Sequence, residues 1–178
     1  EDGSVINKGL FGSSYCKNMY FDGCFMSSMD AHRGAYNVTI KNSTFQHMNF
    51  IGEGLLSIEN VTVYADSNSS GIVLRGDYGS TWRGELNISG FDLRYESASW
   101  LQIIDAKWEN HYFGYSTYMP HTVRLDKITT TKVSYELDSN GKRCETVIVQ
   151  NEMPIYFSKN LNAYTGADIS DPDEEMEL

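Results

Sequence analysis

The 178-residue chain lacks several features that would place it in familiar protein classes. No run of about eighteen apolar residues occurs, which argues against a membrane span. Three cysteines are too few and too odd in number for a disulfide scaffold. Basic residues are scarce, and 14 Lys and Arg against 24 Asp and Glu give a net charge of −10. Because an acidic surface repels phosphate groups, neither nucleic acid nor anionic lipid is an expected partner.

Helical periodicity is also weak, and the sequence contains a short β-type repeat instead. The unit reads apolar, any, apolar, any, and then Gly, Asn or Lys. Its six copies span residues 19–24, 38–43, 56–61, 86–91, 123–128 and 155–160. Repetition of one small unit is typical of a solenoid, in which each unit buries its apolar face only against its neighbours. We therefore expect an all-β solenoid with little helix.

The third residue of each copy serves as an inward anchor. The six anchors are Phe21, Ile40, Ile58, Ile88, Leu125 and Phe157, separated by 19, 18, 30, 37 and 32 residues. This spacing predicts coils of about twenty residues with later insertions. The fifth places hold Gly23, Asn42, Asn60, Gly90, Lys127 and Lys159. Gly and Asn accept a left-handed backbone at low cost and predict a sharp bend, whereas the two Lys copies fit less well.

Five N-glycosylation sequons begin at Asn37, Asn42, Asn60, Asn68 and Asn87. Four of them lie within the repeat, where Asn serves the bend or stacks on the Asn of the next coil. We therefore favour a structural role over surface glycans at those four. Cys24 stands at an inward place, so a small buried hydrophobe is favoured over a bridge to Cys16.

Three stretches of the chain, residues 11–18, 30–43 and 77–84, resemble right-handed parallel β-helix proteins of the pectate-lyase-like superfamily. The resemblance is greatest to a group found in bacterial surface proteins and phage tail or appendage proteins, and it fades beyond Tyr95. It implies an elongated face that tracks a polysaccharide, lyase or hydrolase activity, a homotrimer in phage spikes, and an extracellular, cell-surface or virion location. Calcium is implied by the resemblance alone, and no other cofactor is expected.

The catalytic signatures of that superfamily are missing from the sequence. Polygalacturonases carry adjacent aspartates and a Gly-His-Gly, and pectate lyases carry a Trp-Ile-Asp-His stretch, and this chain has none of these. Whether the protein is an enzyme is therefore left open.

Residues 1–165 are expected to form a right-handed parallel β-helix of about five to six coils, since crossovers between parallel strands are almost always right-handed. Residues 166–178 are expected to be an acidic tail or linker. Because no end cap is evident before Val5 and Ile6, we expect a piece of a longer protein.

Alternation along two strands predicts a candidate site. It sends Asp30 and His32 outward on one segment, and Arg75 and Asp77 outward on another. If residues 64–71 contain an eight-residue loop, Arg75 falls in line with Asp30 and with Asn49 of the coil between, about 10 Å apart. Two further residues complete the expected face, Tyr78 within it and Trp82 at its border.

This cluster admits three interpretations. Two carboxylates could act as general acid and base on a glycosidic bond, or His32 or Arg75 could abstract a proton beside a uronate carboxylate. The cluster could instead bind sugar without catalysis. Solvated or paired side chains on an outer face are the most frequent case and are favoured here.

The segment 100–118 is rich in aromatic residues, which suits either a sugar-stacking platform or, more favoured, core or trimer packing. The four histidines show no metal-ligand spacing, so no metal site is expected. Together these patterns predict a surface module that engages a polysaccharide. The alternative is a structural shaft or spacer that binds nothing.

Overall fold

The computed structural model describes residues 10–65, 69–75, 82–98, 101–107 and 120–152. Its elements are nine strands: β1 (Leu10–Ser13), β2 (Lys17–Asp22), β3 (Phe25–Lys41), β4 (Thr44–Ala65), β5 (Ser69–Arg75), β6 (Trp82–Tyr95), β7 (Leu101–Lys107), β8 (Thr122–Leu137) and β9 (Arg143–Glu152). The described part of the chain contains no helix, so it is all-β, and none of it could span a membrane as a helix.

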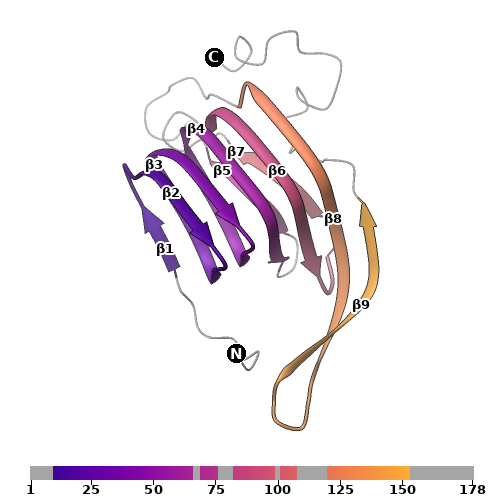
Figure 1. The fold of residues 1–178 in the computed structure, drawn as a ribbon. Coiled ribbons are helices and arrows are strands. Elements are labelled where there is room, and N and C mark those ends of the chain that lie inside the picture. Colours follow the sequence, from indigo (N-terminus) through magenta and orange to yellow (C-terminus); the bar gives the residue numbers. More distant parts are fainter. Residues whose placement is uncertain (1–9, 66–68, 76–81, 99–100, 108–119, 153–178) are drawn as a thin grey trace.

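The strands form one sheet in which nearly all pairs are parallel. A first run of pairing joins β1, β3, β4, β5 and β7. A second run joins β2, β3, β4, β6 and β8. A third run joins the later parts of β4, β6 and β8, and β9 closes it as an antiparallel partner of β8. In Figure 1 the long strands β3, β4, β6 and β8 lie side by side, with β5 and β7 behind them.

The repeat anchors stack as the sequence predicts. In the second run Phe21 pairs with Ile40, Ile40 with Ile58, Ile58 with Ile88, and Ile88 with Leu125. The three central isoleucines are almost fully buried, while the two end members pack against the core from partly buried positions. Phe157 lies outside the described residues.

Each fifth-place residue that the structure describes adopts the left-handed backbone. The φ angles are 64° at Gly23, 47° at Asn42, 52° at Asn60, 69° at Gly90 and 51° at Lys127. Lys127 therefore makes the same bend as the Gly and Asn copies, although its sequence fitted less well.

The corner asparagines are also hydrogen-bonded to one another. Asn42 Nδ2 donates to Asp22 Oδ1 at 2.8 Å, and Asn60 Nδ2 donates to Asn42 Oδ1 at 3.3 Å. A second ladder joins Asn37 Nδ2 to Asn18 Oδ1 at 3.0 Å. Three sequon asparagines thus have the predicted structural role, whereas Asn87 points outward on β6 and Asn68 is not among the described residues.

Two backbones approach closely where β4 and β6 pair at Gly54 and Gly84. Gly84 has φ +138°, and a Cβ at this position would collide with the carbonyl oxygen of Gly54. Only glycine fits such a conformation at this distance. The contact therefore fixes the register at the start of the second run on β6.

A polar and aromatic cluster fastens the β8–β9 hairpin to the sheet. Arg94 on β6 donates to Asp92 at 2.8 Å and forms an ion pair with Glu145 on β9. The Arg143 guanidinium lies 3.2 Å from the centre of the Tyr135 ring and 5.9 Å from that of Tyr64. Burial raises the pKa of both tyrosines, and Glu145 adds to the shift. The hairpin is thus tied to the body by charge and ring contacts.

The cysteines are unbridged. Cys16, Cys24 and Cys144 are all free, and Cys24 is half-buried near the start of the described chain. The favoured packing role over a Cys16–Cys24 bridge agrees with this state, although the thiol of Cys24 is less buried than expected.

Candidate functional site

The first run contains part of the predicted cluster. Asp30 pairs with Asn49 in register, as expected, and His32 follows on the same strand in a half-buried position. Asn49 is only 9% exposed, and its Nδ2 lies 2.7 Å from Nε2 of His47. Asn49 is therefore occupied by its own neighbour and offers little surface to a ligand.

Arg75 does not stand where the sequence places it. Asn49 pairs with Val73, so Arg75 lies two positions farther along β5. The predicted eight-residue loop is wrong, because Tyr64 and Ala65 end β4 and Ser69 already begins β5. The Arg75 side chain, Asp77 and Tyr78 are not among the described parts of the structure.

Trp82 is fully buried rather than at the border of an open face. Its Nε1 donates to the carbonyl oxygen of Gly54 at 3.0 Å, and its ring meets Phe50 edge to face with centroids 6.3 Å apart. A sugar cannot stack on this ring without disrupting the core. The expectation of a partly exposed Trp82 is therefore wrong.

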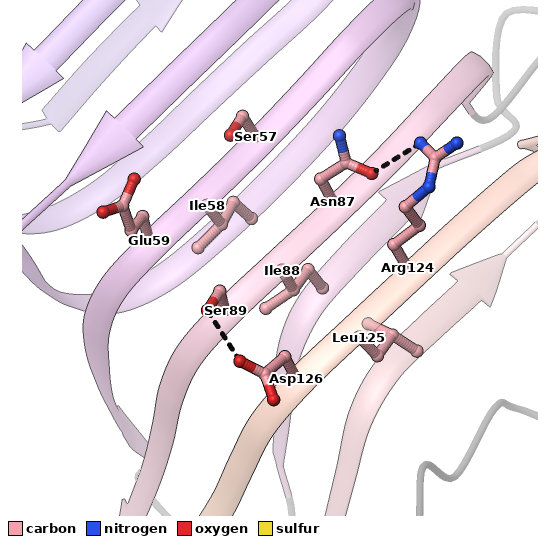
Figure 2. Close-up of a pocket in the computed structure, with 9 residues that line it drawn as sticks. All are labelled: Ser57, Ile58, Glu59, Asn87, Ile88, Ser89, Arg124, Leu125 and Asp126. Carbon is pink, nitrogen blue, oxygen red and sulfur yellow. Dashed lines mark hydrogen bonds between the residues drawn. The ribbon is translucent and has the colours of Figure 1, made fainter.

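The second run carries an open depression on its outer side, with a volume of about 240 Å³. We call it the trough, and it is lined by Ser57, Ile58, Glu59, Asn87, Ile88, Ser89, Arg124, Leu125 and Asp126. Figure 2 shows that these residues come from three neighbouring strands, β4, β6 and β8. Parallel pairing of the strands thus brings together residues that are far apart in sequence.

Two register lines of polar side chains cross the trough. One line consists of Ser57, Asn87 and Arg124, and the other consists of Glu59, Ser89 and Asp126. Arg124 donates to Asn87 Oδ1 at 3.4 Å, and Ser89 Oγ donates to Asp126 Oδ2 at 3.3 Å (Figure 2). Serine is short, so the two serines leave space between longer neighbours.

The charged groups around the trough are arranged in opposite pairs. Lys41 Nζ lies 2.7 Å from Glu59, and this hydrogen bond raises the pKa of Lys41. Arg124 lies 3.0 Å from Glu85. The chemistry available is therefore hydrogen bonding by amide, hydroxyl and carboxylate groups that face solvent.

An exposed aromatic ring extends the first of these lines. Tyr20 pairs with Thr39, which pairs with Ser57, so a single line runs from Tyr20 through Thr39, Ser57 and Asn87 to Arg124. We call it the Tyr20 line. Tyr20 is 62% exposed. The sequence analysis missed this residue, although its outward place in the first repeat copy, next to the anchor Phe21, was the available signal.

The expected aromatic platform cannot be compared in full. Residues 101–107 form β7, whereas residue 100 and residues 108–118 lie outside the described ranges. Among described residues, no group of three or more His, Cys, Asp or Glu side chains is placed to hold a metal ion. The described residues thus do not fit the calcium that the family resemblance implies.

Comparisons of the sequence with protein-family models, with curated proteins and with solved structures give no match.

Proposed function

We propose that this chain is a parallel β-helix module of a surface or secreted protein, and that it binds polysaccharide along the outer side of the second run. The observation that carries the binding proposal is the trough, an open polar depression continuous with the Tyr20 line. The shape suits a chain-like ligand, because the line crosses five strands without interruption.

The β-helix proposal is supported by the periodic register. Partners in the first passes are 18 or 19 residues apart, and the same three runs are visited in order along the chain. A left-handed corner recurs at the same place of each pass. Since crossovers between parallel strands are almost always right-handed, the expected hand is right-handed.

The Tyr20 line offers the mixture of groups that sugars need. Neighbouring strands are about 4.8 Å apart, so the four steps from Tyr20 to Arg124 span about 19 Å. An exposed phenol ring can stack on a sugar face, while Asn87 and Arg124 can donate to ring hydroxyls. Ser57 and Ser89 accept or donate as required. The site is shallow, and each contact is expected to be weak.

Cleavage of the bound glycan is a second candidate function, favoured by one observation. Glu59 and Asp126 face the trough from two strands apart, about 10 Å by strand spacing. Inverting glycosidases hold their two carboxyl groups about 6.5–9.5 Å apart. Binding without cleavage is preferred here, because Lys41 engages Glu59 and both carboxylates are open to solvent.

A structural shaft is the rival from another class, and the corner ladder favours it. Stacked asparagines and ion pairs between passes would build length without any ligand. Binding to a glycan array by the intact parent protein separates the two, and absence of binding would favour the shaft.

The decisive experiment measures binding to a polysaccharide panel together with the release of new reducing ends or unsaturated products. Asn87→Ala is expected to weaken binding about fivefold to tenfold, the loss of roughly one hydrogen bond. Asn140→Ala, an exposed change at the hairpin tip, is the matched control and should leave affinity unchanged. Equal effects of both variants would refute the site.

Tyr20 gives a second, independent probe of the same surface. Tyr20→Ala removes the ring and should lower affinity, whereas Tyr20→Phe keeps the stacking face and removes only the hydroxyl that donates to Asp22 at 3.2 Å. Retention by Phe with loss by Ala supports stacking. Full binding by both variants would restrict the site to the trough itself.

A further inference from the structure

The charges around the trough are balanced residue by residue, and this balance restricts the class of ligand. Three charged side chains line the trough, and each has an opposite charge beside it. Glu59 is paired with Lys41 at 2.7 Å, Arg124 with Glu85 at 3.0 Å, and Asp126 has Lys127 at 4.0 Å. No cation of the trough is left to serve an anionic ligand alone.

The whole chain adds a repulsive field to this local balance. Its net charge is −10, so an approaching polyanion meets repulsion at long range and no excess positive charge at contact. A uronate-rich polymer would have to displace Glu85 from Arg124 or Glu59 from Lys41. Each displacement exchanges one carboxylate partner for another and gains little.

The groups that remain available in the trough are suited to neutral hydroxyls. Asn87 and the two serines can both donate and accept, and the paired carboxylates keep lone pairs that accept from a sugar O–H. The trough has the volume of about eight water molecules, at about 30 Å³ each. One sugar ring is the natural occupant of such a space.

We infer that the trough takes an uncharged glycan, one sugar ring at a time, and discriminates against polyuronates. This inference rests on the proposed glycan-binding function and names the substrate class of the same site. It differs from what the family resemblance implies, since that resemblance points toward uronate chemistry.

A matched pair of polymers tests the inference. The full chain is titrated with neutral polysaccharides, with polygalacturonate, and with polygalacturonate whose carboxyl groups have been reduced to alcohols. Binding to one or more neutral polymers is expected, with a less than twofold change in affinity between about 50 mM and 500 mM salt. Tighter binding to polygalacturonate than to its reduced form, lost on adding salt, would overturn the inference and leave glycan binding intact.

A charge variant provides the converse test. Glu85→Gln frees Arg124 and should raise affinity for polygalacturonate at least threefold at low salt, with affinity for the neutral ligand nearly unchanged. Glu136→Gln, an exposed neutralisation on β8 away from the trough, controls for the change in net charge. Equal gains in both variants would show that long-range charge alone sets the preference and would reject the paired-charge explanation. No binding to any polymer would refute the proposed function and the inference with it.

Discussion

Asn42 combines two tasks in one side chain, because it holds a left-handed corner and links Asp22 to Asn60. Asn42→Ala removes both hydrogen bonds and places a Cβ residue of higher strain at φ 47°. We expect a loss of about 1–2 kcal/mol in the free energy of unfolding, measured by urea denaturation.

Asn42→Gly separates the two tasks, since glycine keeps the corner and loses only the ladder. Its loss should be smaller than that of Asn42→Ala. Asn140→Ala should change stability by less than about 0.5 kcal/mol, as exposed substitutions usually do. A glycine variant less stable than the alanine variant would contradict the role assigned to the corner.

Gly84 is expected to be among the positions least tolerant of a side chain. Gly84→Ala forces a Cβ against the Gly54 carbonyl at φ +138°, and should cost at least about 2 kcal/mol. Gly12→Ala is the matched control, because a Cβ there meets nothing within 4 Å. Similar thermal midpoints for the two variants would show that β4 and β6 can separate at this point.

At this scale the sequence predicted the anchors but not the exposure of every outer residue. Period 2 and the corner residues suffice to place Ile40, Ile58 and Ile88 in one stack, because both features are local. Burial of Trp82 depends on Gly54 and Phe50, which approach it only through the pairing of β4 with β6. Repeat spacing carries no information about such contacts.

At the scale of single elements, the β8–β9 hairpin should be sensitive to alkaline pH. Burial raises the pKa of Tyr135 and of Tyr64 above the ordinary value near 10. Above about pH 10 the unfolded chain releases these protons more readily than the folded one, so stability present below pH 10 is lost as the pH rises.

Tyr135→Phe keeps the ring beneath Arg143 and removes its titration. The fall in urea midpoint between about pH 9 and pH 11 should therefore be smaller in this variant than in the wild type. Tyr15→Phe, at an exposed tyrosine outside the hairpin, should retain the full fall. An unchanged fall in Tyr135→Phe would remove Tyr135 from the explanation.

The misplaced Arg75 shows why element boundaries limit prediction from sequence. Residues 64–71 are polar enough to suggest a loop, yet Ser69, Ser70 and Gly71 belong to β5. Gly71 is buried there because the Phe91 ring leaves no room for a Cβ. Glycine in a strand often marks such a close approach, but its partner on β6 is set only by the tertiary fold.

For the whole molecule, stacked passes predict a gradient of local stability. The described strands β1 and β2 pair only with β3, whereas β4 has partners on both sides. Amides of residues 10–22 should therefore exchange with solvent about 100-fold faster than those of Ile58 and Ile88. Hydrogen exchange measured by NMR checks this, and one common rate would indicate that the chain opens only as a unit.

The constant step of the early register makes this chain a candidate ruler for protein engineering. Phe21, Ile40 and Ile58 follow one another at 19 and 18 residues, and Lys41 stands opposite Glu59. A duplicate of residues 41–58 spliced in after Ile58 would reproduce every neighbour on both sides. Such a variant would be longer by one strand spacing, about 4.8 Å, so molecular length could be set in discrete increments by counting copies.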